Sequence, residues 1–242
     1  MVEILDRVKA ILLDIEGTTT PIDYVFGTLF PFAHQGVAAF LASHSTEPEV
    51  QADIAQLRQD YRQDLAKGID LPLWTGPDAT APVPYIQYLI TQDRKSTGLK
   101  ALQGKIWQQG YQDGRLQSVL FADVRPAFEQ WMAAGKALYI YSSGSIQAQQ
   151  LLFRYSEAGD LTPLIQGYFD TQIGPKQDSA SYAAIAAQIG IPPAEILFIS
   201  DVTAELQAAQ KTGMWVLCSI RTGNRPLEST FFPSIDSFHL IS

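Results

Sequence analysis

Four short apolar runs, each ending in a polar turn, constrain the fold of this 242-residue chain more than any other feature. The runs occupy residues 8–14, 137–141, 196–200 and 214–218. A near-continuous apolar run of this length is typical of a strand that is buried on both faces of a sheet. We therefore expect four strands of a mainly parallel sheet.

Between these runs, apolar residues recur every three or four positions, as they do on the buried face of a helix. Four such stripes follow one another along the chain: Phe128, Trp131 and Met132; Leu151, Leu152 and Tyr155; Tyr182, Ile185, Ala186 and Ile189; Val202, Leu206 and Ala209. Gly190 and Pro192 end the third stripe. Strands that alternate with helices predict an α/β fold, with a doubly wound, mainly parallel sheet and helices on both faces.

The stretch between the first two runs has a different pattern. It contains no convincing strand, and its apolar positions recur at helical spacing, as at Leu99, Leu102 and Ile106. Proline and glycine interrupt it repeatedly between residues 68 and 84. We therefore expect a helical domain at residues 23–117, inserted after the first strand of an α/β core that comprises residues 1–22 and 118–242.

The charge and the single cysteine argue against several classes of protein. With 17 Lys+Arg and 25 Asp+Glu, the formal net charge is −8, which repels nucleic acid and anionic lipid. Cys218 is the only cysteine, so no internal disulfide can form. The N-terminus does not resemble a signal peptide, and no apolar run approaches the roughly 18 residues that span a bilayer. We expect a cytoplasmic protein with no nucleic-acid or membrane partner.

Polar side chains follow three of the predicted strands. Asp14, Ser142 and Asp201 stand at these strand ends, and ligands of open parallel sheets bind beyond the carboxyl ends of the strands. Asp14 and Glu16 are two residues apart, so both carboxylates can face one cavity, where one attacks and the other moves a proton. The same segment, which contains Gly17, would also suit an ordinary turn.

Each of the other candidates also has a purely structural interpretation. Residues 142–145 form either an anion site at a helix N-terminus or a simple helix cap. Lys176 is either a ligand for a phosphate or a surface lysine. Asp201 could hold Mg²⁺ together with Asp14 and a main-chain carbonyl, or it could favour the start of the next helix. The order of these candidates along the chain, each at the edge of a strand, favours the functional interpretation.

These residues resemble the four motifs of the haloacid dehalogenase superfamily of phosphotransferases. Longer segments are similar to its enolase-phosphatase, or acireductone synthase, family: DIEGTTTPI at 14–22, DRKSTGLKALQG at 93–104, FADVRP at 121–126, YSSGS at 141–145 and RTGNRPL at 221–227. Glu16 stands where most members of the superfamily have Asp. Pro175 stands where the family pattern has His, which leaves Lys176 in place and alters only the local loop.

The resemblance implies an enzyme of methionine salvage with a Rossmann-like core and a helical cap. Members of the family convert 2,3-diketo-5-methylthiopentyl-1-phosphate to the acireductone 1,2-dihydroxy-3-keto-5-methylthiopentene. They enolise the diketone first and then remove the phosphate through an aspartyl-phosphate. They require Mg²⁺ and are typically monomeric, so the implied partner is a small phosphorylated diketone.

Roles for individual residues follow from the resemblance alone. It implies that Asp14 is the nucleophile and Glu16 the acid and base. It implies that Ser142 and Ser143 bind the phosphate, and that Lys176 holds both the phosphate and Asp14. The implied metal ligands are Asp14, Asp201 and the main-chain carbonyl of Glu16. The base of the enolase step is a separate hypothesis. We assign it to Glu16, because its carboxylate is not expected to bind the metal.

Two other functions stay open on the sequence. A phosphomonoesterase for another small phosphate ester would share the core motifs and differ in the inserted domain. A receiver domain, in which a phosphorylated aspartate is a signal, is much shorter and has no large helical insertion. A dinucleotide-binding protein is disfavoured because no Gly-x-Gly-x-x-Gly segment follows a strand.

Overall fold

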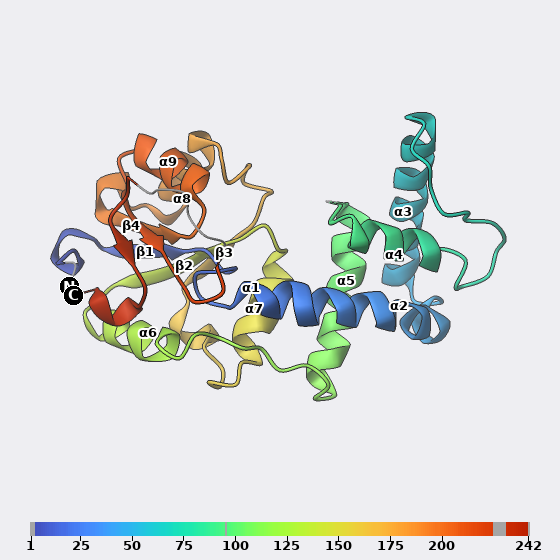
Figure 1. The fold of residues 1–242 in the computed structure, drawn as a ribbon, viewed down its shortest axis with the longest axis horizontal. Helices are drawn as coiled ribbons and strands as arrows, with labels where there is room; N and C mark the ends of the chain where they lie inside the picture. The colour runs from blue at the N-terminus through green and yellow to red at the C-terminus, as the bar shows by residue number, and fades with distance from the viewer. Residues whose placement is uncertain (1–2, 95, 225–230, 242) are drawn as a thin grey trace. The chain divides into compact units, whose positions relative to one another are not determined.

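The chain folds into two compact units in the computed structural model, which describes residues 3–94, 96–224 and 231–241. The core unit comprises Met1–Val25 and Gln117–Ser242, and the helical unit comprises Phe26–Leu116 (Figure 1). Two of the segments that carry the resemblance are only partly described, since Lys95 and residues 225–227 lie outside the described residues.

The core unit is built on a six-stranded parallel sheet, which confirms the predicted fold class. Its strands are β1 (Ala10–Leu13), β2 (Ala137–Tyr141), β3 (Gly167–Phe169), β4 (Ile196–Ser200), β5 (Trp215–Ser219) and β6 (Ser234–Ile235). They lie in the order β3-β2-β1-β4-β5-β6. Leu13, at the end of the fully buried strand β1, is opposite Ile140 of β2 and Ile199 of β4, so these three strands end at the same level.

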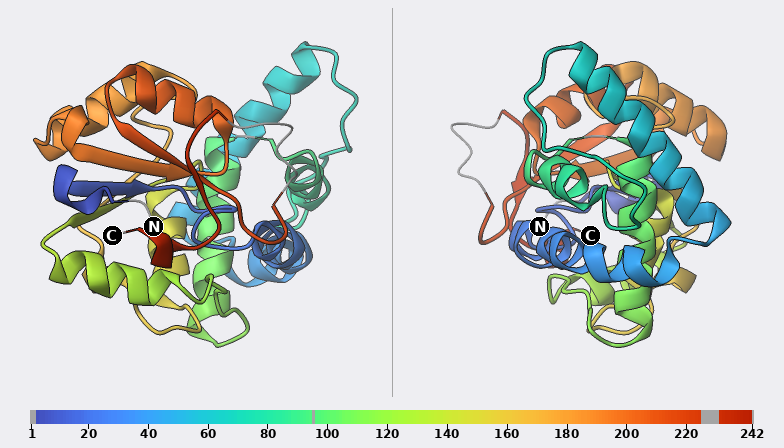
Figure 2. Two further views of the ribbon diagram at one scale, coloured as in Figure 1. Left: turned by 60° about the vertical axis from the view of Figure 1, so that its left-hand side comes forward. Right: turned by 90° about the vertical axis from the view of Figure 1, so that its right-hand side faces the viewer.

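Helices cover both faces of this sheet (Figures 1 and 2). The helices α6 (Val124–Ala133) and α7 (Ile146–Arg154) lie on one face, and α8 (Ser179–Ile189) and α9 (Thr203–Lys211) lie on the other. Short helical turns connect the elements: η1 (Leu5–Arg7), η3 (Thr162–Leu164), η4 (Pro193–Glu195) and η5 (Phe238–Leu240). Most residues of the predicted stripes are buried, but Met132 is 38% exposed and Val202 is 36% exposed. Val202 precedes the first turn of α9 and does not belong to its apolar face.

Strands β3 and β6 were not predicted from the sequence. They contain three and two residues and lie at the two edges of the sheet. Such short strands give no apolar run, and β3 begins with Gly167, a residue that is depleted in strands. The four predicted strands, by contrast, occupy the middle of the sheet, where burial on both faces demands apolar residues.

The helical unit contains no strand among its described residues, as the sequence predicted. Its helical elements begin at the end of the core segment: α1 (Ile22–Tyr24), the single π-turn η2 (Val25–Leu29), α2 (Phe30–His44), α3 (Pro48–Ala66), α4 (Val83–Thr91) and α5 (Thr97–Gln112). Helices α3 and α5 pack closely at Gly98, where a Cβ atom would lie 2.9 Å from the carbonyl oxygen of Asp53. Buried Leu57 and Leu102 belong to the same two helices.

The helical stretch Ile22–His44 corrects one expectation from the sequence. It is long and apolar enough to cross a membrane by length and composition alone, with a mean hydropathy of 1.4 in its most apolar window. The expectation that the chain has no apolar stretch of this length is therefore wrong. Gly27, Pro31 and Gln35 interrupt the stretch, so it does not read as one continuous apolar run. A helix in the core of a soluble protein meets the same criterion, and α2 packs against α4 and α5.

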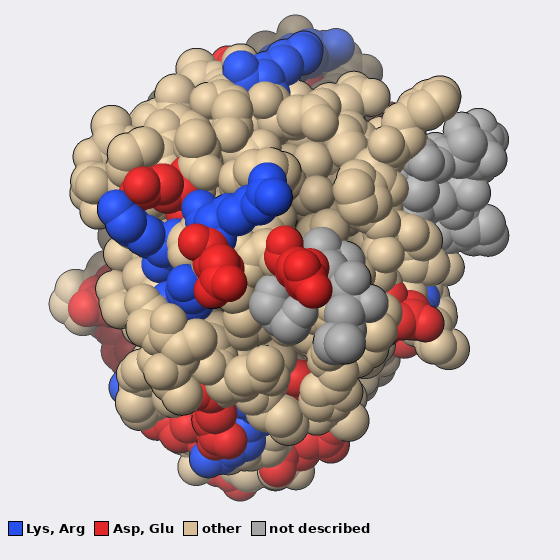
Figure 3. Space-filling model, turned by 90° about the vertical axis from the view of Figure 1, so that its left-hand side faces the viewer, with Lys and Arg blue, Asp and Glu red and all other residues tan. Residues whose placement is uncertain are grey.

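Acidic and basic side chains are mixed on the face of the molecule drawn in Figure 3. Exposed ion pairs such as Lys9–Glu195, at 2.8 Å, contribute little to stability because water screens them. Several Lys and Arg side chains gather near the middle of this face, and Asp and Glu side chains lie directly beside them (Figure 3).

Candidate active site

Asp14 leaves the central strand β1 at the edge where β2 and β4 also end. Its side chain is buried, although a charged group is rarely buried without partners. Oδ1 accepts hydrogen bonds from the main-chain N–H of Ile15 at 2.8 Å and from Lys176 Nζ at 2.5 Å. Oδ2 accepts one from Ser200 Oγ at 3.1 Å. Because its orientation is set from several directions, the carboxylate is pre-organised for chemistry at this edge.

Lys176 is a buried residue, which excludes the interpretation of a solvated surface lysine. Its Nζ lies 2.5 Å from Asp14 Oδ1 and 2.7 Å from Glu205 Oε2. Burial alone would lower the pKa of Lys176, but the negative charges of Asp14, Glu205 and Glu16 raise it above its ordinary value. The ammonium group therefore stays protonated and supplies fixed positive charge.

Three hydroxyl groups hold the loop that carries Lys176. The carbonyl groups of residues 174, 175 and 176 accept hydrogen bonds from Tyr141 OH at 2.9 Å, Ser181 Oγ at 2.8 Å and Tyr182 OH at 2.8 Å, respectively. All three donor side chains are buried. The loop with proline in place of the expected histidine is thus fixed by donors from β2 and α8.

Glu16 follows β1, Ser142 follows β2, and the two residues meet at the same edge of the sheet. Ser142 Oγ donates a long hydrogen bond, 3.4 Å, to Glu16 Oε2 and accepts one from the N–H of Gly144 at 3.1 Å. Ser143 is half-buried in the same turn. The residue that caps α7 is Ser145, whose Oγ accepts from the N–H of Ala148. Ser142 is therefore not needed as the helix cap.

Asp201 follows β4 directly and lies beside Gly17. A Cβ atom on Gly17 would lie only 2.3 Å from Asp201 Oδ2, so the loop after Asp14 approaches this carboxylate closely. Burial and then the negative charge of Asp14 raise the pKa of Asp201 to about 7. Val202, rather than Asp201, caps α9, and no side chain provides a capping hydrogen bond there. The capping alternative therefore does not explain Asp201.

Glu205 is a residue of the site that the sequence interpretation did not include. It lies one helical turn after Asp201, and this spacing was its only sequence signal. Its carboxylate pairs with Lys176 and lies 3.0 Å from Ser200 Oγ, whose single proton is shared between Glu205 and Asp14. Burial and then the charge of Asp14 raise the pKa of Glu205, while Lys176 opposes this shift. Glu205 thus holds the ammonium group from the side opposite Asp14.

Side chains at the end of β5 and just after it hold the main chain at Gly17 and Thr18. The carbonyl of Gly17 accepts hydrogen bonds from Ser219 Oγ at 3.1 Å and Asn224 Nδ2 at 2.9 Å. The carbonyl of Thr18 accepts one from Arg221 Nε at 3.2 Å. Arg221 and Asn224 lie in the segment 221–227 that carries part of the resemblance, but sequence reasoning gave them no role.

The charges of the site leave an excess of negative charge. Four carboxylates, Asp14, Glu16, Asp201 and Glu205, influence one another around a single ammonium, Lys176. The described part of the chain contains no group of three or more His, Cys, Asp or Glu side chains arranged to hold a metal ion. Mg²⁺ needs no such cage, because it commonly binds one or two carboxylates and keeps several waters. The oxygen donors and the uncompensated charge therefore fit a hard divalent cation.

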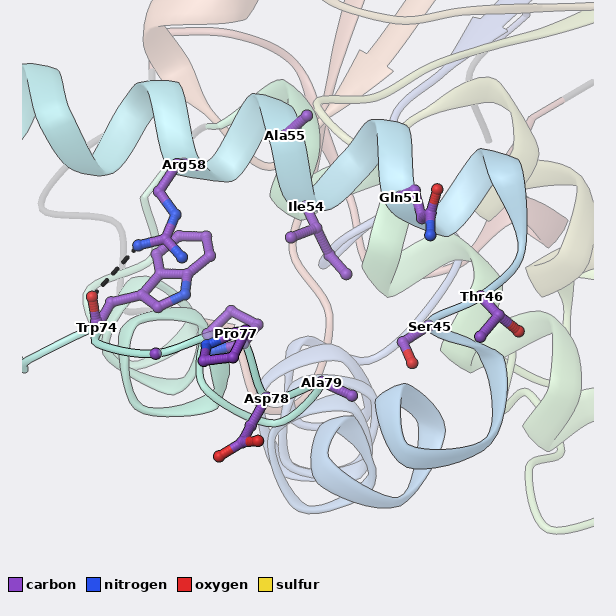
Figure 4. Close-up of a pocket in the computed structure, with 12 residues that line it drawn as sticks. Ser45, Thr46, Gln51, Ile54, Ala55, Arg58, Trp74, Pro77, Asp78 and Ala79 are labelled. Carbon is purple, nitrogen blue, oxygen red and sulfur yellow. Dashed lines mark hydrogen bonds between the residues drawn. The ribbon is translucent and has the colours of Figure 1, made fainter.

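A separate groove of about 480 Å³ lies within the helical unit (Figure 4). It contains none of the predicted site residues. The guanidinium of Arg58 lies over the ring of Trp74, 3.8 Å from its centroid, and donates to the Trp74 carbonyl at 3.2 Å. Ile54 and Pro77 also line the groove. Because the groove shares no residue with the site around Asp14, the groove is assigned no ligand.

Comparisons with known proteins show to which family the chain belongs. The family described as haloacid dehalogenase-like hydrolase matches residues 8–213. The chain is 59% identical over 231 residues to Enolase-phosphatase E1 of Synechococcus elongatus, which covers 96% of each chain. It is 49% identical over 216 residues to Enolase-phosphatase E1 of Pseudomonas aeruginosa, which covers 89% of this chain and 91% of the relative.

A solved structure extends the similarity to the fold. The crystal structure of the UTR4 protein of Saccharomyces cerevisiae superposes with a TM-score of 0.76 at 32% identity, and the match covers 96% of this chain and 99% of the yeast chain. The similarity in fold therefore extends over almost the whole length of both chains. The chain belongs to the enolase-phosphatase E1 family of haloacid dehalogenase-like hydrolases.

Proposed function

We propose that this protein is an Mg²⁺-dependent acireductone synthase of methionine salvage. It enolises 2,3-diketo-5-methylthiopentyl-1-phosphate and then removes the phosphate to give 1,2-dihydroxy-3-keto-5-methylthiopentene. The observation that carries the proposal is the buried pair of Asp14 and Lys176, 2.5 Å apart, in a chain that belongs to the enolase-phosphatase E1 family. We further propose that the enzyme is monomeric and cytoplasmic.

Asp14 is the proposed nucleophile in phosphate removal. Its carboxylate oxygen attacks phosphorus and the ester oxygen leaves, which forms an aspartyl-phosphate that water then hydrolyses. The transferring group spreads negative charge over three oxygens, so positioning and positive charge provide most of the catalysis. Lys176, held by Asp14 and Glu205, supplies one fixed positive charge at this position.

Mg²⁺ would be held by the carboxylates of Asp14 and Asp201 and by the main-chain carbonyl of Glu16. When bound, it supplies Lewis-acid stabilisation of negatively charged oxygens on the substrate. Neighbouring side chains orient the main chain at this point. The side chains of Ser219 and Asn224 donate hydrogen bonds to the carbonyl of Gly17 and so hold the main chain directly after the Glu16 carbonyl.

Glu16 is the proposed acid and base. Its carboxyl group protonates the leaving ester oxygen and later takes a proton from the attacking water. The hydrogen bond from Ser142 Oγ is long, so Ser142 remains available to bind the phosphate together with Ser143. Glu16 is also the proposed base that removes the proton next to the carbonyl group in the enolase step.

The helical unit is the proposed cap of the enzyme. A cap that closes over bound substrate excludes water and protects the enol intermediate from side reactions. The alternative function, a general phosphomonoesterase, would use the same core residues. The family membership favours the enolase-phosphatase, because the related proteins carry that name across almost the whole chain.

Phosphate release and enol formation from the diketone phosphate, measured with Asp14→Asn, test the proposal. The variant is expected to lose phosphate release by several orders of magnitude, because an amide does not form the acyl phosphate. Asp178→Asn is the matched control: it makes the same chemical change at the N-cap of α8, where Asn caps as well as Asp, and is expected to retain activity. Full turnover by Asp14→Asn would contradict the mechanism.

A substrate panel separates the two candidate functions. Rapid hydrolysis of simple phosphate esters with no conversion of the diketone phosphate would support the phosphomonoesterase. The role of Glu16 in enolisation is tested by hydrogen–deuterium exchange into the diketone. If Glu16→Gln abolishes phosphate release but leaves that exchange intact, another residue is the base.

A further inference from the structure

Asn224 lies after β5, and its amide group has a defined orientation. Nδ2 donates to the carbonyl of Gly17 at 2.9 Å and, more weakly, to the carbonyl of Ser219 at 3.4 Å. Both partners are acceptors, so the nitrogen and not the oxygen must face them. The position of Oδ1 follows from these two hydrogen bonds.

The oxygen of the same amide is buried and has no hydrogen-bond partner among the described residues. It lies 3.0 Å from the point where a Cβ atom on Gly17 would be, and Asp201 Oδ2 lies 2.3 Å from that point. Asn224 Oδ1 and Asp201 Oδ2 therefore border the same small space beside Gly17. A buried polar atom without a partner costs free energy, which calls for a functional explanation.

The missing partner must be a hydrogen-bond donor. Asn224 Oδ1 can only accept, and the neighbouring Gly17 carbonyl and the ionised carboxylate of Asp201 are acceptors as well. A water molecule held by a divalent cation is a strong donor, and Asp201 is a ligand of the cation in the proposed function. Groups that bind and orient the ligands of a metal commonly change its affinity 10–100-fold when they are removed.

We propose that Asn224 is a positioning residue of the Mg²⁺ site, whose Oδ1 accepts a hydrogen bond from a metal-held water while its Nδ2 fixes Gly17. This inference rests on the proposed function, since it needs a cation at Asp14 and Asp201. It gives a second role to Asn224, a residue of the segment 221–227 that carries part of the resemblance. The oxygen and the nitrogen of the Asn224 amide thus have different roles, and different substitutions at this position can test each role separately.

The test is Mg²⁺ binding to the whole protein without substrate, measured by isothermal titration calorimetry. Asn224→Ala removes both ends of the amide and is expected to raise the Mg²⁺ dissociation constant roughly 10–100-fold. Ser219→Ala is the matched control, because it removes the other side-chain donor to the Gly17 carbonyl and leaves Asn224 Oδ1 in place. Because Ser219 also helps to orient Gly17, we expect a smaller loss of Mg²⁺ affinity than for Asn224→Ala, and the difference between the two variants measures the contribution of Asn224 Oδ1.

Asn224→Asp separates the two roles further. It keeps an acceptor oxygen and loses the Nδ2 donor, so it is expected to bind Mg²⁺ at least as tightly as the wild type. Thermal unfolding in EDTA shows whether each variant is folded, and Asn224→Asp provides the test if Asn224→Ala does not fold. The inference is overturned if Asn224→Ala binds like the wild type, if both alanine variants lose affinity equally, or if Asn224→Asp is as weak as Asn224→Ala.

A failure of the proposed function would look different. If the wild-type protein does not bind Mg²⁺ at all, the metal site itself is wrong, whatever the variants do. If the wild type binds Mg²⁺ and the variants do not rank as expected, only the role of Asn224 is wrong.

Discussion

At the scale of single residues, Gly17 connects backbone conformation with the site. Its φ of +71° is unfavourable for any residue with a side chain, and a Cβ atom there would meet Asp201 Oδ2 at 2.3 Å. The positive φ and the close approach of Asp201 each require a residue without a side chain, which explains the glycine in the segment DIEGT. The close approach brings the main chain after Asp14 next to the carboxylate at the end of β4.

Gly17→Ala is expected to abolish most activity and to weaken Mg²⁺ binding, because the added carbon displaces Asp201. Gly190→Ala is the matched control: Gly190 also has a φ of +71°, but no atom lies within 4 Å of its would-be Cβ. Each variant should lose roughly 1–2 kcal/mol of stability from the left-handed conformation. Only Gly17→Ala should lose activity, as measured by phosphate release. Equal activity of the two variants would refute the argument.

The buried ion pair of Asp123 and Arg221 gives a prediction about pH. Asp123 Oδ2 accepts from Arg221 at 2.7 Å and from the N–H of Phe238 at 2.6 Å. Burial alone would raise the pKa of Asp123, but these hydrogen bonds lower it below the ordinary value of 3.8. The pair therefore stabilises the fold fully above about pH 4, and this contribution is lost as the pH falls through the folded-state pKa.

Asp123→Asn should destabilise the protein by about 3 kcal/mol at neutral pH, because it leaves the Arg221 charge buried without its partner. The difference from the wild type should shrink as the solution is acidified below about pH 4, where the wild type loses the same charge. Urea unfolding at several pH values measures this. Asp113→Asn, in an exposed pair with Arg115, should unfold like the wild type. A pH-independent difference for Asp123→Asn would show that the charge is not the cause.

Candidate site residues could be predicted from the sequence where each one directly follows a predicted strand. Asp14, Ser142 and Asp201 each follow an apolar run, so the rule for parallel sheets places them at one edge. Glu205 and Asn224 were not assigned, because their partners lie far away in the chain. Glu205 meets Lys176, and Asn224 meets Gly17, only after the helices and the loop after β5 have packed.

At the scale of elements, the loop before α8 shows how a segment without regular structure becomes rigid. Its three successive carbonyl groups, at residues 174–176, accept hydrogen bonds from buried hydroxyl groups. A proline in this loop removes one main-chain donor, and side-chain donors fix the conformation instead. The hydroxyl groups that do this belong to β2 and α8, so the position of Lys176 depends on the packing of both elements.

Tyr182→Phe should lower kcat more than KM, because Lys176 loses the hydrogen bond that fixes its main chain. The variant leaves a buried carbonyl without a donor and should lose about 1–3 kcal/mol of stability. Tyr139→Phe is a suitable control, since Tyr139 makes only a long hydrogen bond of 3.4 Å to Gln166. Steady-state kinetics and thermal unfolding measure both effects. An unchanged kcat in Tyr182→Phe would mean that the loop is held without this bond.

The elements that were predicted and those that were missed differ in burial. Strands β1, β2, β4 and β5 lie in the middle of the sheet, and their apolar runs result from burial on both faces. The edge strands β3 and β6 are too short for any pattern. The apolar stretch Ile22–His44 was underestimated for the opposite reason, because only a third of its most apolar window is buried and polar residues interrupt it.

At the scale of the whole molecule, the chain consists of two compact units, and each buries apolar side chains of its own. The helical unit buries Leu57 and Ile86, and the core unit buries Leu138 and Phe198. Each unit has its own apolar centre, so each can lose stability by itself. In the proposed enzyme, the helical unit can therefore change its conformation or stability while the sheet that positions Asp14 stays intact.

Leu57→Ala should therefore destabilise the helical unit selectively. Removing a fully buried leucine side chain costs about 2–5 kcal/mol. Hydrogen exchange should become faster across Phe26–Leu116, while the strands β1, β2 and β4 stay protected. Leu138→Ala, in β2, should give the opposite pattern, with faster exchange in the sheet. If either substitution raises exchange equally in both units, the molecule unfolds as one cooperative body, and independent motion of the proposed cap must be abandoned.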